Sequence, residues 1–351
     1  MIKLQIILPA LAATLIFFCR TVSGADTVSP APASPRARVV TVRNPSATEA
    51  FKPRAGLVEA MMNQAITNFT SQPNASAAWI KLAGTNDIIG IKVYTTPGPI
   101  IGTRVEVTAA VVKGLLAAGV ATNRIIVWDR HEASLRQAGY FELVERFGIR
   151  VAGAAEAGYD ERSFYETALL GNLIFGDLEF GSKEDGAGRK SFVSKLVTRD
   201  MTRIIVIAPV INHNSAGVAG CLFSLAMGSV DNIGRFDGNP VRLAEAVPDI
   251  YALPPLADRV VLNISDALVC QYQGEDKGLI HYSTALNEIR LSRDPVALDV
   301  LALQDLEAGR KARGQISFPV NWELYKNAAL PGIDLGVAET NRIEVITLEA
   351  R

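Results

Sequence analysis

Histidine is scarce in this chain, and one histidine stands in a polar turn between two apolar runs. Of the three histidines, His213 lies in the turn Asn212-His213-Asn214, between the aliphatic residues 204–208 and the apolar residues 217–227. The first run predicts a strand buried on both faces and the second a helix. Ligands of open α/β sheets bind beyond the carboxyl ends of strands, where such turns lie. We therefore expect His213 to be functional, with Asn212 and Asn214 contacting the substrate; the alternative is a histidine that only hydrogen-bonds the turn.

Two further predicted strands carry ionisable residues at their carboxyl ends. Lys92 lies inside the apolar strand IIGIKV, and Asp129, Arg130 and His131 follow the strand RIIVW. A buried lysine is costly, so the amine of Lys92 reaches either water at the strand end or an anionic group. The charged turn is either a solvated corner or a site, and its similarity to the turn at His213 favours a site. Lys92 and Arg130 are thus candidate substrate-binding residues, and Asp129 is a candidate catalytic carboxylate.

A carboxylate also follows the apolar run RVVLNI, at Asp266. If the sheet is parallel, we expect Asp266 to lie at the same sheet edge as the other two turns. His213 would then act as a general base, assisted by Asp129 or Asp266. The alternative is a divalent metal held by His213, His131 and Asp266, because mixed His/Asp sites suit such ions. No HExxH motif, cysteine cluster or phosphate-binding glycine loop occurs, so no iron–sulfur cluster is expected.

Composition and the amino terminus bound the class of protein. The chain has 351 residues, of which 49% are hydrophobic and 20% charged, which is typical of a globular protein with a sizeable core. Its net charge of −1 provides no general field for nucleic acid. Lys3, an apolar stretch ending at Cys19 and small residues before Ala25 predict a cleaved signal peptide over residues 1–25. We expect an exported protein, periplasmic or extracellular, without a stable membrane span; an uncleaved anchor is the alternative.

Repeated strand, turn and helix patterns predict the fold class. We expect an α/β fold with a mostly parallel sheet and helices on both faces; the alternative to a single unit is two α/β lobes. Residues 26–55, rich in Pro, Ala and Ser, predict a flexible leader, so the α/β domain spans residues 56–351. Thr103 with Glu106 forms a capping-box pattern, and Asp294 before Pro295 predicts a helix start.

Other segments give weaker predictions. Residues 173–180 alternate like an exposed strand, residues 182–190 read as a loop, and residues 192–199 predict a helix. Cys221 and Cys270 lie in apolar surroundings, which favours buried free thiols over a disulfide.

The order and spacing of several stretches resemble the family called domain of unknown function 362. The stretches are IIGIKV, IIVWDR, IIVIAPVINHNSAGV, Asp266 after RVVLNI, RDPVALD and LGVAETNRIEVI, covering roughly residues 85–348. The central turn of that family usually reads Lys-Thr-His; this chain keeps the histidine, His213, and lacks the lysine. The ferredoxin-like cysteine segment of some relatives is absent. The resemblance implies an α/β fold, marks His213, Asp266 and Asp294 as matching positions and implies no particular reaction.

Three classes of function remain open. The first is an exported enzyme that uses either a metal or His/Asp acid–base chemistry at the strand ends. The second is a periplasmic protein that binds a small anion through Lys92, Arg130 and main-chain amides at helix starts. The third is a structural or interaction role in which the polar turns only join elements.

Overall fold

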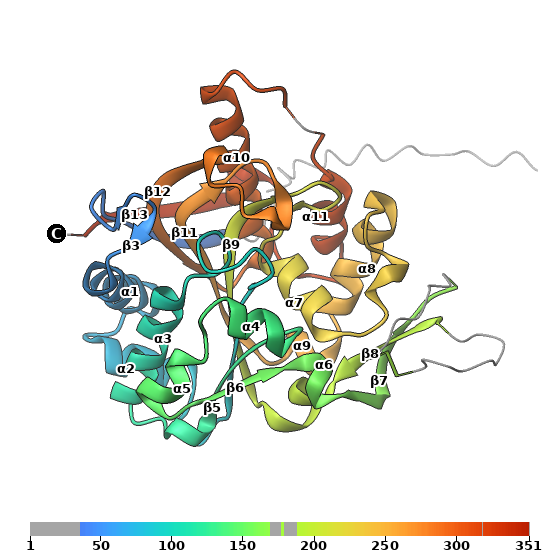
Figure 1. Cartoon of the computed structure of the whole chain (residues 1–351), viewed down its shortest axis with the longest axis horizontal. Coiled ribbons are helices and arrows are strands. Elements are labelled where there is room, and N and C mark those ends of the chain that lie inside the picture. Colours follow the sequence, from blue (N-terminus) through green and yellow to red (C-terminus); the bar gives the residue numbers. More distant parts are fainter. Residues whose placement is uncertain (1–35, 169–176, 179–187, 318, 351) are drawn as a thin grey trace, which may run out of the picture. The chain divides into compact units, whose positions relative to one another are not determined.

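The computed structural model describes residues 36–168, 177–178, 188–317 and 319–350. These described residues belong to one compact unit. Its central sheet, within the described ranges, has the following strands in spatial order (Figure 1): β13 (Ile343–Glu349), β1 (Ala37–Arg43), β12 (Ser283–Ser292), β11 (Val260–Gln271), β9 (Arg203–His213), β4 (Ile89–Lys92), β5 (Ile125–Asp129) and β6 (Arg150–Gly153).

The sheet is mostly parallel, as predicted. Strands β11, β9, β4, β5 and β6 pair in parallel, and β1 pairs in parallel with β13. Only β12 runs against its neighbours β11 and β1, while the short β10 (Gly217–Val218) folds back on β9. The carboxyl ends of β4, β5 and β9 therefore meet at the same edge, which confirms the predicted α/β class.

Both faces of the sheet are covered by helices, and the side chains of β9 divide between them. Ile204 and Val206 enter the core on one face, and Ile205 and Ile207 enter the core on the other. This division explains the unbroken aliphatic sequence of the strand. One core receives α1 (Ala55–Thr70), α2 (Ala75–Leu82), α3 (Val105–Ala117), α4 (Glu132–Gln137) and α5 (Glu142–Phe147); the other receives α7 (Cys221–Ser229), α8 (Pro240–Tyr251), α10 (Pro295–Ala312) and α11 (Trp322–Ala328) (Figure 1).

The predicted flexible leader over residues 26–55 is wrong from Ala37 onward. Ala37–Arg43 forms β1, which lies between β12 and β13 and buries Val39, Val40 and Val42. Two short strands, β2 (Thr48–Glu49) and β3 (Lys52–Pro53), follow it. A run of β-branched residues outweighs the Pro- and Ser-rich composition around it because the sheet buries that run. The predicted signal peptide and residues 26–35 lie outside the described residues.

Two other local predictions need correction, and two more fall largely outside the described residues. Residues 192–199 form no regular α-helix: β8 (Lys190–Ser194) pairs with β7 (Tyr159–Glu166), and a π-helical turn, Leu196–Asp200, follows. Residues 173–176 and 179–187 lie outside the described residues, so the strand and loop predicted there are not seen. Thr103 does not cap α3; its hydroxyl donates to Ile207 O, and the helix begins after Arg104.

Two carboxylates, one at the start of α10 and one within it, accept hydrogen bonds from main-chain amides at the amino ends of helices. Asp294 accepts a hydrogen bond from Ala297 N and caps α10, as predicted. Asp299, one turn later, accepts from the first two amides of α7, Cys221 N at 2.7 Å and Leu222 N at 3.0 Å. A Cβ on Gly220 would lie 2.1 Å from Asp299 Oδ1, so this approach requires glycine. Cys221 and Cys270 are both buried and free.

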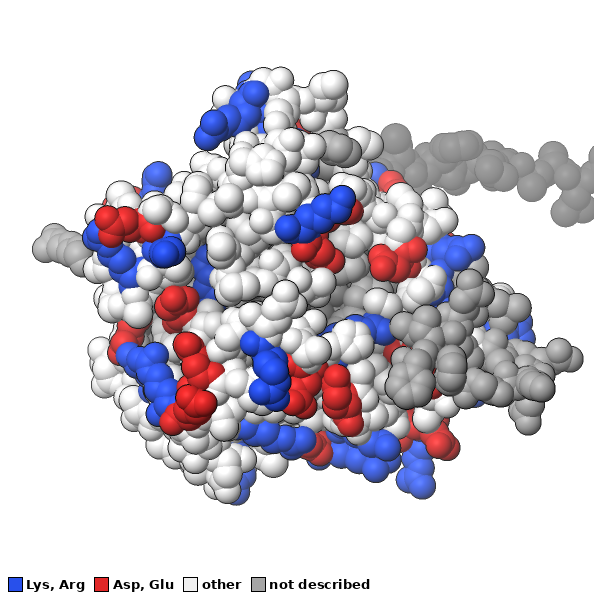
Figure 2. Space-filling model, in the orientation of Figure 1, with Lys and Arg blue, Asp and Glu red and all other residues white. Residues whose placement is uncertain are grey.

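The surface of the described part mixes both charges. Basic and acidic side chains are interspersed on the face that Figure 2 draws. Among the described helices, none is long and apolar enough to span a membrane.

Candidate functional site

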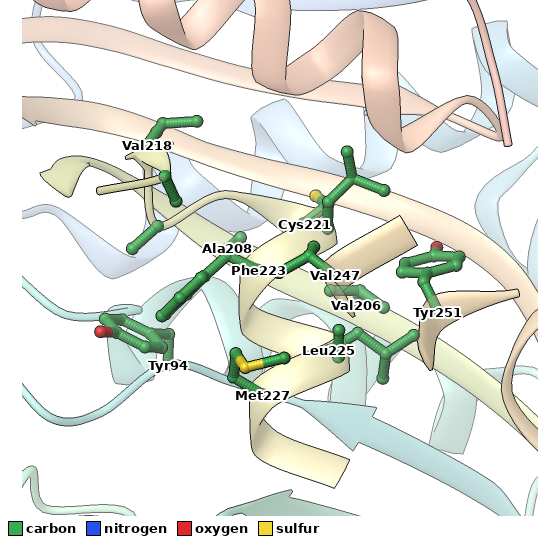
Figure 3. Packing of buried hydrophobic residues seen from close by; sticks show 14 of the residues in the cluster. Tyr94, Val206, Ala208, Val218, Cys221, Phe223, Leu225, Met227, Val247 and Tyr251 are labelled. Carbon is green, nitrogen blue, oxygen red and sulfur yellow. The ribbon is translucent and has the colours of Figure 1, made fainter. Parts of the chain in front are cut away.

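A cavity of about 380 Å³ lies at the carboxyl ends of β4, β5 and β9 and against α7. We call it the strand-end cavity. Its volume is in the range of small-molecule sites. Its larger apolar side chains are Tyr94, Phe223, Met227 and Ile233, and its polar ones are Thr96, Asp129, Arg130, His131, His213, Ser224, Asp237 and Asp276. Figure 3 shows Phe223 and Met227 projecting from α7 on the side where Tyr94 lies.

Lys92 and Asp129 form a buried ion pair behind this cavity. Lys92 Nζ lies 2.8 Å from Asp129 Oδ1, and the two residues are 0% and 4% exposed. The ammonium also donates to Val93 O at 2.6 Å and to Ser224 Oγ at 3.1 Å. Burial lowers the pKa of Lys92, and the Asp129 carboxylate opposes that shift. The anionic group that the buried lysine requires is therefore Asp129, and Lys92 itself does not line the cavity.

Asp129 is saturated with donors. Besides Lys92, its carboxylate accepts from Thr95 N at 2.8 Å, Thr95 Oγ1 at 2.6 Å and Arg130 N at 2.8 Å. These bonds join the turn after β4 to the turn after β5. Asp129 therefore anchors the cavity wall. Both of its carboxylate oxygens already accept hydrogen bonds, so neither is available to take a proton from a substrate.

Gly228 makes room for the lysine. A Cβ at this position would lie 2.3 Å from Lys92 Cε and 2.8 Å from its Nζ. Gly228 lies in the last turn of α7, which ends at Ser229. The requirement for glycine comes from a side chain 136 positions away in the sequence (228 − 92), which a local pattern does not reveal.

His213 is the last residue of β9, and the backbone of the following turn fixes its ring. Nδ1 accepts hydrogen bonds from Ser215 N at 3.3 Å and Ala216 N at 3.0 Å. An Nδ1 that accepts cannot carry a proton, so the neutral ring carries its proton on Nε2. His213 therefore presents a hydrogen-bond donor, and this tautomer suits neither a base nor a metal ligand at Nε2.

The surroundings of His213 keep it neutral. Its ring centroid lies 4.3 Å from that of Phe223. Burial lowers the pKa of His213, and the carboxylates of Asp237, Asp276 and Glu275 oppose the shift.

Asp276 and Tyr94 supply an acid–base group that sequence reasoning missed. Tyr94 OH donates to Asp276 Oδ1 at 2.7 Å, and both residues line the cavity. Desolvation raises the pKa of Asp276, and the hydrogen bond from Tyr94 opposes the shift. Asp276 is exposed as a whole residue and also lines the cavity.

Arg130 and His131 lie together on the cavity wall. Arg130 donates to Met227 O at 3.2 Å through one terminal nitrogen and to His131 Nε2 at 3.2 Å through Nε. Burial, and then the charge of Arg130, lower the pKa of His131. Among the described residues that line the strand-end cavity, the Arg130 guanidinium is therefore the cation available to a ligand.

Asn212 and Asn214 position a neighbouring loop and do not line the cavity. Asn212 Oδ1 accepts from Glu275 N at 3.1 Å, and Asn214 N donates to Glu275 Oε1 at 2.9 Å. Both contacts hold the residue next to Asp276. The two asparagines therefore act on the site through the Glu275–Lys277 turn.

Asp266 lies apart from the strand-end cavity. β11 continues to Gln271, so Asp266 lies inside the strand, fully buried. Its Oδ1 lies 2.9 Å from Arg104 NH1, and its Oδ2 accepts from Arg104 N at 2.9 Å. This pair fixes the start of α3 to the sheet.

The structure does not bring the expected metal ligands together. Among the described residues no group of three or more His, Cys, Asp or Glu side chains could hold a metal ion. His131 and His213 line one cavity, but Asp266 is paired with Arg104 elsewhere. His281, the third histidine, stacks on Tyr282 in a 3₁₀ turn outside the cavity.

A larger cavity, of about 710 Å³, lies near the amino end of α10. Asp294 lines it, but its carboxylate is already bound by Ala297 N and Val337 N. Of the matching positions that the resemblance marks, only His213 lines the strand-end cavity.

The family model described as domain of unknown function (DUF362) matches residues 89–304. The chain belongs to this family. No curated protein matches the chain. The matched DUF362 region runs from β4 into α10, so it includes every residue that lines the strand-end cavity. The family description assigns no reaction.

Proposed function

We propose that this DUF362 protein is an exported enzyme that moves a proton on a small polar substrate in the strand-end cavity. Asp276 is the acid–base group, and His213 is a neutral hydrogen-bond donor to the substrate. The observation that carries the proposal is that both side chains line one cavity while each is held by its own partner.

The carboxyl of Asp276 has the properties that proton transfer needs. Tyr94 occupies its Oδ1, and within the described part of the chain no hydrogen bond occupies its Oδ2. Desolvation raises the pKa of this carboxyl, which is the direction that favours a general acid–base group. The Nε2–H of His213 would stabilise negative charge that develops on a substrate oxygen.

The alternative is a periplasmic protein that binds a small anion without converting it. Lys92 supports anion binding less well than the sequence suggested, because the Asp129 carboxylate neutralises the charge of its ammonium group. Arg130 supports it, because its guanidinium faces the same cavity. The two proposals therefore share a location and differ in whether the ligand is consumed.

A ligand screen followed by a consumption assay separates the two proposals. Compounds that raise the melting temperature of the purified protein are incubated with it and followed by NMR. We expect a stabilising compound to be converted by the wild type and not by Asp276→Asn. The matched control is Asp258→Asn, an exposed carboxylate before the opposite end of β11, which should keep full activity. Stabilisation without conversion identifies a binding protein instead.

Export is tested separately. The sequence of residues 1–25 supports cleavage near Ala25. Intact-mass measurement of the protein recovered outside the cytoplasm should give a chain that begins close to that residue. A full-length mass would favour the uncleaved anchor.

A further inference from the structure

The hydroxyl of Ser224 is an unused donor in the wall of the strand-end cavity. A lysine ammonium has three hydrogens, and Lys92 directs them to Val93 O, Asp129 Oδ1 and Ser224 Oγ. Ser224 therefore accepts from Lys92 and keeps its own hydrogen. Ser224 is 1% exposed and lines the cavity, and among the described residues its hydroxyl donates no hydrogen bond.

Two more donors face the same space. The Nε2–H of His213 is one, because the turn backbone occupies Nδ1. The second terminal nitrogen of Arg130 is the other, because Nε and the first terminal nitrogen bind His131 and Met227 O. A hydroxyl, an imidazole N–H and a guanidinium together suit an oxygen-rich anionic group.

The opposite charge is present at the same cavity. Asp237 is exposed, and only one of its carboxylate oxygens accepts a hydrogen bond within the described part of the chain, from Gly238 N. It acts electrostatically on both His213 and Asp276. With the Lys92–Asp129 pair neutral, the described residues that line the cavity offer one cation, Arg130, and the carboxylates of Asp237 and Asp276. Those carboxylates repel a dianion such as phosphate and attract an ammonium group.

We propose that the ligand of the strand-end cavity is a free amino acid or a similar small zwitterion. Its carboxylate binds Arg130, Ser224 and the Nε2–H of His213, and its ammonium binds Asp237. This inference rests on the proposed function in that it places the ligand in the same cavity. It leaves Asp276 as the acid–base group and gives Asp237 a binding role.

The experiment compares ligands that differ in one charged group. The purified protein is titrated calorimetrically with the standard L-amino acids, the corresponding 2-hydroxy acids, the corresponding amines and inorganic phosphate. We expect at least one amino acid to bind more tightly than its hydroxy acid and than its amine, and phosphate not to compete. Binding of phosphate, or equal binding of an amino acid and its amine, would overturn the inference, as would failure of every amino acid to bind.

Variants test the two charge contacts one at a time. Arg130→Gln should weaken amino-acid binding at least about tenfold, because a hydrogen bond to a charged group is lost. Asp237→Asn should weaken amino-acid binding about two- to fivefold and leave hydroxy-acid binding unchanged. Unliganded melting temperatures check that each variant folds, and Arg130→Lys, which keeps the charge, should retain part of the affinity.

The inference and the proposed function fail in different ways. If amino acids bind with this pattern and are not converted, the ligand class stands and the enzyme proposal fails. If a neutral or dianionic compound is converted and no amino acid binds, the enzyme proposal stands and the ligand class is wrong.

Discussion

Lys92 on β4 and Asp129 on β5 are paired at 2.8 Å, and both residues are buried. The pair ties together the two turns that form one side of the strand-end cavity. Lys92→Met should lower the free energy of unfolding by about 3–5 kcal/mol, because it leaves a buried carboxylate without its cation. Urea denaturation measures this, and the double variant Lys92→Met/Asp129→Leu should recover part of the loss. A single variant within about 1 kcal/mol of the wild type would contradict a sealed ion pair.

Gly228 gives a second test of the same packing. Gly228→Ala should destabilise the protein by about 1–3 kcal/mol, because the new methyl group overlaps the end of Lys92. The matched control is Gly56→Ala in α1, where nothing lies within 4 Å of the added Cβ. The control should be neutral or slightly stabilising, since alanine favours a helix. Equal effects at the two positions would show that crowding of Lys92 is not the cause.

Asp299 should make stability fall as pH rises. Burial against α7 raises the pKa of Asp299 from 3.8 to about 7 in the folded protein. The folded state thus holds this proton more tightly than the unfolded chain does, so the contribution is full below pH 3.8 and is lost as pH rises through about 7. The wild type should lose roughly 3 kcal/mol between pH 5 and pH 8 through this group.

Asp299→Asn isolates that contribution. Urea unfolding at both pH values should show a smaller difference in the variant than in the wild type. Asp294, whose pKa burial raises to about 6, gives the comparison: Asp294→Asn should remove a smaller part of the slope. An unchanged pH dependence in Asp299→Asn would mean that its carboxylate is not desolvated in solution.

The tautomer of His213 can be observed directly. With three histidines in the chain, ¹⁵N-detected NMR can assign each ring by single substitution. We expect His213 to carry its proton on Nε2 and to have a pKa below 6.5. Asp276→Asn should lower that pKa further, because a carboxylate that favours the charged ring is removed. A proton on Nδ1 would contradict the turn geometry and restore His213 as a candidate base.

The parallel sheet and the position of His213 could be predicted because each depends on short-range patterns. Unbroken aliphatic runs mark strands buried on both faces, and His213 ends the strand that contains such a run. The partners of Lys92 and Asp266 could not be predicted, because Asp129 and Arg104 reach them from other strands and helices.

Asp276 was not identified from the sequence as a site residue because the predicted strand β11 was too short. Sequence reasoning ended the strand before Asp266, whereas β11 continues to Gln271 through a bulge. The rule that sites follow strand ends would have pointed to the Glu275–Lys277 turn had the strand been drawn at its full length. Asp266 stays inside the strand because Arg104 pairs with its carboxylate, and a simple alternation pattern does not anticipate such a partner.

The most direct test of the acid–base proposal is the rate at which Asp276→Asn converts a saturating ligand of the strand-end cavity. Saturation separates turnover from binding. We predict a turnover number about 10²- to 10⁴-fold below that of the wild type, with the ligand still bound. Turnover equal to that of the wild type would contradict the assignment of Asp276 as the group that moves the proton.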